Sequence, residues 1–181
     1  MDKNFKTNYN YPDFYNWPFF FTLQKHEETK RNQFEKWAEL TKDFCKSNKI
    51  YKISKDDFLR HLGKNEKINR QISSEFSDKL FEYFIKIRLL NVYGKDIYYV
   101  FWKKQEEWEE TIYSAVIKQH RVETLETLDY LIYDEEMRKE EFYNMDKEML
   151  ELILKNMEKK SMCHLLTDDN GIYVAVKFIK T

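Results

Sequence analysis

Apolar side chains recur every three or four positions in four stretches of the chain, which predicts four amphipathic helices. The stripes are Phe34, Trp37, Leu40, Thr41, Phe44 and Cys45; Phe76, Leu80, Phe84 and Ile87; Trp108, Ile112, Ala115 and Val116; and Met149, Leu152, Ile153 and Met157. In each half of the chain a shorter helix is expected between the two long helices, at residues 54–62 in the first half and 124–132 in the second. Ser54 and Asp57 match the spacing of a capping box and support the first of these helices.

A β-hairpin is expected after each set of three helices, at residues 89–102 with a turn at 94–96, and at residues 162–178 with a turn at 168–171. Asn170-Gly171 predicts a two-residue turn in the second hairpin, because Asn and Gly accept the positive φ that such a turn requires. After this turn, Ile172, Val174, Val176 and Phe178 alternate with Tyr173, Ala175 and Lys177. This alternation predicts a half-buried strand.

The order of three helices and a hairpin therefore occurs twice, as a weak internal repeat. A three-helix bundle closed by a β-hairpin is the winged-helix layout, so the predicted fold is α+β with two winged-helix domains in tandem. We expect an extended docking segment at residues 1–21, a first domain at 22–104 and a second domain at 105–181.

Both prolines of the chain, Pro12 and Pro18, lie in an N-terminal segment that is crowded with aromatic residues. Proline is excluded from helix interiors and pushes the preceding residue to extended geometry, so the segment is expected to be extended. Aromatic residues dominate interface hot spots, and burying each ring is worth roughly 1.5–3 kcal/mol. The candidate partner-binding residues are Tyr11, Pro12, Phe14, Trp17, Pro18, Phe19 and Phe20.

Two interpretations of this segment remain open. It either covers its own first domain, or it fills a groove on another protein. A mixture combines them, with Phe19 to Leu23 covering the first domain and the upstream part reaching a partner.

The net charge of −1 conceals an asymmetry between the halves of the chain. Residues 1–104 carry 21 Lys and Arg against 14 Asp and Glu, whereas residues 105–181 carry 10 against 18. The split suggests two domains that face different partners, or solvated faces that differ by chance. Charges on the third helix of each set nearly cancel, and phosphate contacts supply most non-specific DNA affinity, so the pattern argues against nucleic acid. The basic first half leaves DNA or an anionic membrane open as a partner, and a nucleic-acid-binding tandem winged helix remains the alternative function.

Motifs for catalysis or metal binding are missing from the sequence. The four histidines form no HExxH pattern, the two cysteines form no CxxC pair, and the three glycines are scattered. We therefore expect no enzymatic activity, no cofactor and no metal. The chain has no apolar run long enough for a transmembrane helix, and its start lacks the features of a signal peptide. Cys45 and Cys163 are accordingly expected to be reduced in a cytoplasmic protein.

Four groups of residues resemble one known family. They are Trp17-Pro18-Phe19-Phe20-Phe21-Thr22-Leu23-Gln24; the helix 33–45 with Trp37 and Phe44-Cys45; Asn65-Glu66-Lys67-Ile68-Asn69-Arg70; and Phe101-Trp102 followed by Glu106-Glu107-Trp108 and Ile112-Tyr113. The family is that of vacuolar protein-sorting-associated protein 25, the small subunits of the ESCRT-II complex. The resemblance covers nearly the whole chain, and these four groups are its most specific parts.

The resemblance implies a non-enzymatic ESCRT-II subunit with two winged helices in tandem. Its N-terminal proline motifs would insert into the two larger winged-helix subunits of the complex, and its second winged helix would recruit an ESCRT-III subunit. Such a complex sorts ubiquitinated membrane proteins into multivesicular bodies. The implied localisation is cytoplasmic with peripheral recruitment to endosomal membranes, which this subunit would contact indirectly through the rest of the complex.

One feature departs from the family pattern. The family commonly has paired prolines before the aromatic residue, whereas Tyr11-Pro12 and Trp17-Pro18 each contain one proline. Each motif keeps an aromatic residue two positions after its proline, Phe14 and Phe20. We therefore expect the docking role to be retained.

Overall fold

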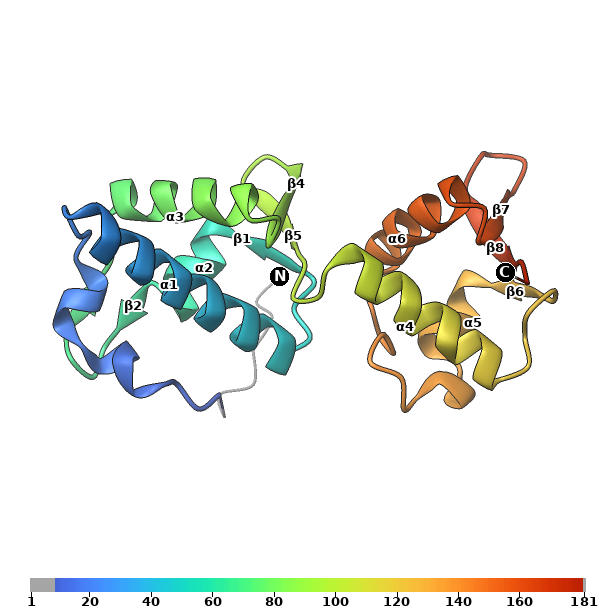
Figure 1. Cartoon of the computed structure of the whole chain (residues 1–181), viewed down its shortest axis with the longest axis horizontal. Helices are drawn as coiled ribbons and strands as arrows, with labels where there is room; N and C mark the ends of the chain where they lie inside the picture. Colours follow the sequence, from blue (N-terminus) through green and yellow to red (C-terminus); the bar gives the residue numbers. More distant parts are fainter. Residues whose placement is uncertain (1–8, 181) are drawn as a thin grey trace. The chain divides into compact units, whose positions relative to one another are not determined.

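The chain divides into two compact units, Met1–Trp102 and Lys103–Thr181 (Figure 1). The computed structural model describes residues 9–180, so the first eight residues of the expected docking segment lie outside the described residues. Within this described range, no helix is both long enough and apolar enough to cross a membrane.

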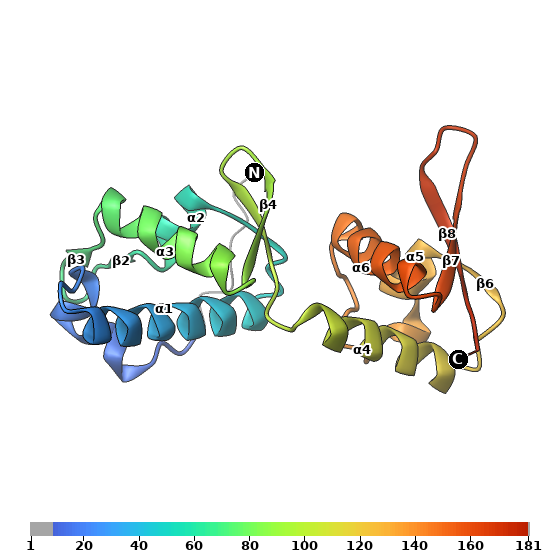
Figure 2. The same ribbon diagram turned by 45° about the horizontal axis from the view of Figure 1, so that its top comes forward.

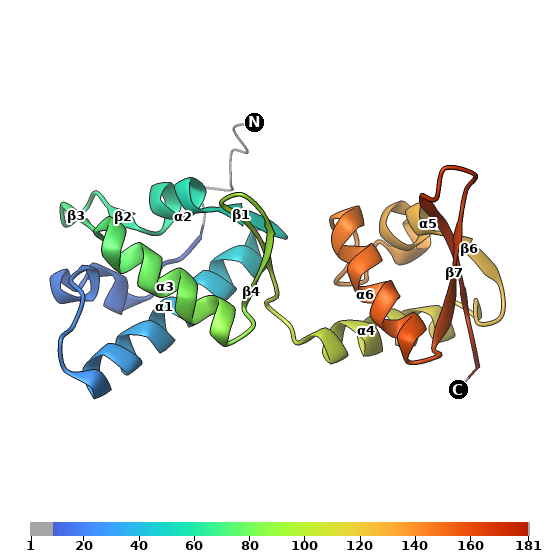
Figure 3. The ribbon, with the colours of Figure 1, turned by 90° about the horizontal axis from the view of Figure 1, so that it is seen from above.

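The first unit is a three-helix bundle closed by a small antiparallel sheet. Its elements are the 3₁₀ turns η1 (Asp13–Asn16) and η2 (Pro18–Phe21), then α1 (Glu27–Ser47), β1 (Lys52–Ser54), α2 (Lys55–His61), β2 (Lys64–Asn65), β3 (Arg70–Gln71), α3 (Ser74–Lys86), β4 (Leu90–Gly94) and β5 (Ile97–Val100). The sheet has the order β1-β5-β4, and β2 pairs with β3 separately. Helices α1 and α3 contact each other and cross in the view of Figure 3.

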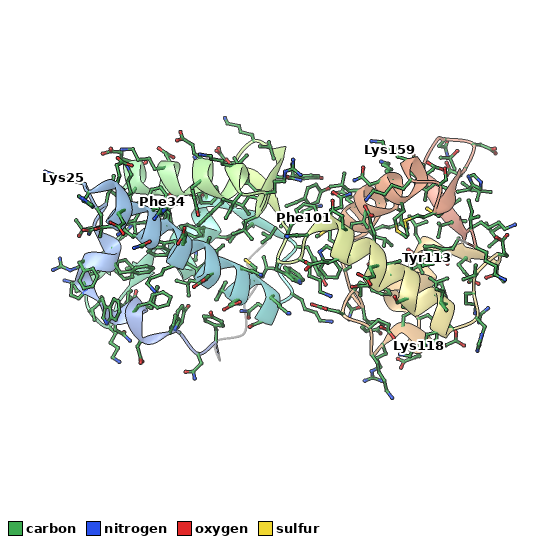
Figure 4. The ribbon with its side chains drawn as sticks, in the orientation of Figure 1. Lys25, Phe34, Phe101, Tyr113, Lys118 and Lys159 are labelled. Carbon is green, nitrogen blue, oxygen red and sulfur yellow. The ribbon has the colours of Figure 1, made fainter. Side chains whose placement is uncertain are left out.

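Aromatic rings from the three helices fill the core of the first unit. The predicted stripe on α1 is buried in full, which confirms that helix. Trp37 is completely buried, and its ring lies 5.9 Å from Phe58 of α2 and 6.2 Å from Phe76 of α3. Phe34, labelled in Figure 4, lies 5.9 Å from the Phe76 ring. The predicted cap of α2 is present as well, because the Asp57 amide donates to the Ser54 hydroxyl at 3.0 Å.

The second unit repeats this layout. Its elements are α4 (Gln105–Lys118), β6 (Leu125–Thr127), α5 (Leu128–Tyr133), the 3₁₀ turn η3 (Glu135–Met137), α6 (Lys147–Lys159), β7 (Cys163–Thr167) and β8 (Tyr173–Phe178). The sheet has the order β6-β8-β7, and its β7–β8 hairpin extends beyond the helices (Figure 2). Trp108, Ile112, Ile153 and Phe178 are fully buried. The α+β class and the tandem winged-helix arrangement are thus confirmed.

Each of the two three-stranded sheets contains a strand that the sequence did not indicate. Strand β1 pairs with β5, and β6 pairs with β8. The helix predicted at 124–132 is consequently shorter than expected. It begins at Leu128, after Thr127 caps it, because Leu125–Thr127 hydrogen-bond to β8 as a strand instead.

The wing of the second unit also differs from the prediction. The turn runs from Asp168 to Ile172, and of the two residues expected to have positive φ only Gly171 does, at 77°. The Asp168 carboxylate accepts the amides of Asn170 and Ile172, both at 2.9 Å, which stabilises this longer turn. A register shift between Leu166 and Thr167 interrupts the expected alternation. Val176 and Phe178 are therefore buried, while Ile172 and Val174 are exposed.

Candidate partner-docking segment

The segment before α1 is wound into two 3₁₀ turns, which corrects the expectation of an extended strip. The Tyr15 amide donates to the Pro12 carbonyl at 2.9 Å, and the Phe20 amide donates to the Trp17 carbonyl at 3.0 Å. Pro12 and Pro18 lie at the starts of these turns, where a missing N–H costs nothing. Trp17 keeps the extended geometry expected before a proline, with ψ of 120°.

Tyr15 anchors the first turn to the domain. Its ring is buried, and its hydroxyl lies 2.9 Å from the Leu62 carbonyl oxygen and 2.8 Å from that of Lys64. The Asn65 side chain donates to the Tyr15 carbonyl at 2.8 Å. Burial raises the pKa of Tyr15 well above its ordinary value, so the hydroxyl stays protonated and can donate.

Phe20 anchors the second turn. Its ring is 2% exposed and lies flat against the Trp37 indole, with centroids 4.4 Å apart and planes at 10°. The Trp37 indole N–H donates to the Phe20 carbonyl at 3.2 Å. Phe21 is buried beside the same indole. Phe20 was a candidate partner-binding residue, but it belongs to the core of the first unit and is not part of the exposed surface.

Gln33 of α1 holds the backbone of the second turn. Its side-chain amide donates to the carbonyls of Phe20 and Thr22, both at 2.9 Å, and its oxygen accepts the Gln24 amide at 3.2 Å. Sequence reasoning missed Gln33 and Asn65 as anchors. Gln33 precedes Trp37 by one helical turn and therefore lies on the apolar side of the helix. A polar residue on that side was the signal in the sequence that could have identified Gln33 as an anchor.

The rings of Phe14, Trp17 and Phe19 are left for contact with solvent, and we call these three residues the aromatic ridge. Phe19 is 59% exposed and Trp17 44%, and their rings stack on each other at 5.4 Å. Phe14 is half-buried 6.3 Å from Trp17, with the Lys36 ammonium 5.1 Å from its centroid. Pro18, between the two exposed rings, is exposed as well.

Tyr11 and Pro12 lie at the other end of the segment. The Tyr11 hydroxyl donates to the His61 carbonyl at 2.9 Å, and its ring stacks on Tyr15 at 4.4 Å. Pro12 is half-buried. These two residues therefore cover the Tyr15 anchor and do not extend the ridge.

The metal-ligand groups and the two cysteines of the described residues were the remaining candidates for a chemical site. Between residues 9 and 180, no group of three His, Cys, Asp or Glu side chains is placed to hold a metal ion. Cys45 and Cys163 are buried, and burial raises the pKa of both thiols, that of Cys163 to about 12. Both are therefore protonated and unreactive near neutral pH.

These features define the class as a tandem winged-helix protein that presents an anchored aromatic segment. Comparison with known proteins identifies the family. The model of the ESCRT-II complex subunit family matches residues 14–146, which include the aromatic ridge and most of both units. The chain belongs to this ESCRT-II subunit family.

Individual relatives agree over almost the full chain. Vacuolar protein-sorting-associated protein 25 of Xenopus laevis is 29% identical over 88% of this chain and 93% of its own length. The crystal structure of subunit VPS25 of the endosomal trafficking complex ESCRT-II superposes with a TM-score of 0.85 at 25% identity, covering 93% of this chain and 98% of that chain. A chain from the crystal structure of the ESCRT-II complex of VPS22, VPS25 and VPS36 has a TM-score of 0.79 at 24% identity, with the same coverage.

Proposed function

We propose that the chain is a non-enzymatic subunit of an ESCRT-II complex and that its aromatic ridge docks on the larger subunits. One observation carries the docking proposal: Trp17 and Phe19 are exposed rings on a segment whose backbone is fixed to the first unit. A similar chain has been crystallised in a complex of VPS22, VPS25 and VPS36, which supports two further ESCRT-II subunits as the partners.

The physical advantage of this arrangement is preorganisation. Exposed aromatic rings gain free energy when a partner groove removes them from water. Because Gln33 and Trp37 already fix the backbone of the second turn, docking orders little additional chain. Pro18 restricts the turn between the two rings further.

We also propose that the second unit recruits an ESCRT-III subunit. Residues 105–181 carry an excess of eight acidic residues. Exposed apolar side chains lie on the same unit, including Leu166, Ile172 and Val174 of the β7–β8 hairpin. An acidic surface with exposed apolar groups suits a basic amphipathic helix, which binds through its apolar face and is attracted by its charge.

The biological setting that follows from this proposal is the cytoplasmic face of endosomes. The complex would sort ubiquitinated membrane proteins into multivesicular bodies, and the subunit would be recruited peripherally. Its contribution would be assembly, with no catalytic step.

The docking proposal is tested by co-purification with the two larger ESCRT-II subunits. The intact chain is compared with a Trp17→Ser, Phe19→Ser double variant, which changes only exposed rings. We expect the intact chain to join the complex and the double variant to remain free. An Ile117→Ser variant, which removes an exposed apolar side chain of the second unit, is the matched control and should still assemble.

Unchanged thermal unfolding of the double variant would show that lost assembly does not result from lost folding. Equal assembly of the intact chain and the double variant would place docking elsewhere. Failure of the intact chain to assemble would overturn the proposal that it is an ESCRT-II subunit.

A further inference from the structure

A second apolar surface lies on the first unit, away from the aromatic ridge in sequence. Outside the N-terminal segment, every large exposed apolar side chain of residues 9–102 falls between Ile85 and Ile97. These side chains are Ile85, Ile87, Val92, Tyr93 and Ile97. They come from the C-terminal end of α3 and from both faces of the β4–β5 hairpin beside it (Figure 2), because Val92 pairs with Tyr98 whereas Tyr93 contacts Tyr99. We call these five side chains the wing surface. Val92 is 66% exposed, more than any other residue of the set.

Basic residues are interleaved with the wing surface. Lys86, Arg88 and Lys95 lie in the same stretch, whose only acidic residue is Asp96. None of the three basic side chains forms an ion pair within the described part of the chain. Lysines elsewhere on the unit do, such as Lys55 with Asp78 and Lys79 with Glu75. The positive charges of the wing surface are therefore available to a partner.

A lysine and two tyrosines are arranged on one face of the hairpin. The rings of Tyr93 and Tyr99 meet edge to face at 5.0 Å. The Lys52 ammonium lies 4.2 Å from the Tyr93 centroid and 5.3 Å from that of Tyr99. This contact places a fourth positive charge beside the Tyr93 ring.

We propose that the wing surface inserts into the headgroup region of an anionic lipid bilayer. Aliphatic side chains gain free energy by entering the boundary of the acyl chains, and Lys and Arg attract anionic headgroups. Tyrosine favours the same interface, because its ring is apolar and its hydroxyl polar. A nucleic acid would also use the basic residues, but the exposed aliphatic side chains of Ile87, Val92 and Ile97 favour the lipid interface.

This inference goes beyond the proposed function, in which the subunit reaches the membrane only through the rest of its complex. It assigns a direct lipid contact to the first unit. Because the surface belongs to one chain, the isolated full-length chain is sufficient to test it.

The first experiment is co-sedimentation of the full chain with vesicles of phosphatidylcholine, with or without phosphatidylserine. We expect binding only to the anionic vesicles at low salt. A Lys86→Gln, Arg88→Gln, Lys95→Gln variant should bind more weakly, by roughly five-fold for each charge removed. A Val92→Ser, Ile97→Ser variant should also bind more weakly, while Ile117→Ser and Leu125→Ser, exposed positions of the second unit, should bind as the intact chain does.

A second experiment locates the contact without removing any wing side chain. Gly94 lies near the tip of the hairpin, and a Cβ there would meet no atom within 4 Å. A Gly94→Cys variant can be labelled with a polarity-sensitive maleimide dye, because Cys45 and Cys163 are both completely buried. The dye should shift to the blue with anionic vesicles. The same dye on Ser114→Cys, an exposed position of α4, should not shift.

Three results would overturn the inference: no binding of the intact chain to anionic vesicles, equal binding of the wing variants, or a dye at position 94 that stays in water. Binding to duplex DNA without binding to vesicles would assign the surface to nucleic acid and would also overturn it. The proposed function fails in a different way, through loss of co-purification. Wing variants that still assemble but no longer bind vesicles would separate the two activities.

Discussion

At the scale of single residues, neighbours of the same type have opposite environments. Phe19 is exposed, whereas Phe20 stacks on Trp37 in the core. Local sequence does not distinguish them, because both follow Pro18 in a run of three phenylalanines. The difference arises from the 3₁₀ turn, which directs successive side chains away from one another, and from the position of Trp37 in the folded bundle.

This difference predicts unequal effects of the same substitution. Phe20→Ala should lower the free energy of unfolding by about 3–5 kcal/mol, the usual cost of removing a buried aromatic ring. Phe19→Ala should change it by less than about 0.5 kcal/mol, because the ring is mostly exposed. Urea denaturation of the full chain measures both values. Equal losses would contradict the core position of Phe20.

His61 gives a prediction for pH. Burial is the main cause that lowers its pKa below the ordinary value of 6.5, and Asp57 partly opposes the shift. The native state therefore binds the proton less readily than the unfolded state, and the free energy of unfolding should fall as the pH drops below 6.5. A His61→Gln variant should lose less stability than the intact chain over that range, as measured by thermal unfolding. The same dependence in both proteins would refute the role of His61.

At the scale of elements, the long helices and both hairpins could be predicted, because their apolar patterns extend over many residues. Strands β1 and β6 could not, since a pattern of period two has no statistical weight in three residues. Their strand geometry comes from pairing with β5 and β8, which lie more than forty residues away along the chain.

The conformation of the aromatic segment was predicted wrongly, as an extended strip. Prolines exclude a helix interior, yet they permit the first position of a short 3₁₀ turn. The turns are stabilised because side-chain N–H groups of Gln33, Trp37 and Asn65 donate hydrogen bonds to their backbone carbonyl oxygens. These partners are distant in sequence, so composition alone could not select between an extended strip and a turn.

The two hairpins provide a matched pair of glycines. Gly171 has a φ of 77°, which side chains rarely tolerate, so Gly171→Ala should destabilise the chain by about 1–2 kcal/mol. Gly94 has no positive φ and no atom within 4 Å of an added Cβ, so Gly94→Ala should be neutral or stabilise by up to about 1 kcal/mol. Chemical denaturation of both variants tests this contrast. Destabilisation by Gly94→Ala of the same size would show that strain at φ is not the cause.

At the scale of the whole molecule, the two units carry net charges of opposite sign, positive in the first and negative in the second. The five excess positive charges of residues 1–102 and the six excess negative charges of residues 103–181 give two units that attract opposite partners. No single ion pair produces this property, and screening by salt reduces it.

The division predicts a salt-dependent association with a basic partner. The association rate of the full chain with a Lys- and Arg-rich helix from an ESCRT-III subunit should fall several-fold between low and physiological ionic strength. Stopped-flow fluorescence or surface-based kinetics can measure it. A rate that does not depend on salt would mean that the acidic excess of the second unit does not guide the encounter.

The anchors of the aromatic segment also bear on how this protein can change over generations. Gln33 and Trp37 donate to carbonyl oxygens of the backbone, and every residue at positions 19, 20 and 22 supplies such an oxygen. A mutation at Phe19 therefore changes the side chain that a partner would contact, while the hydrogen bonds that hold the backbone of the segment on the first unit are kept. The backbone conformation of the segment and its exposed side chains can therefore change independently. The docking surface of this subunit and the groove of its partner can co-evolve in small steps while the subunit keeps its fold.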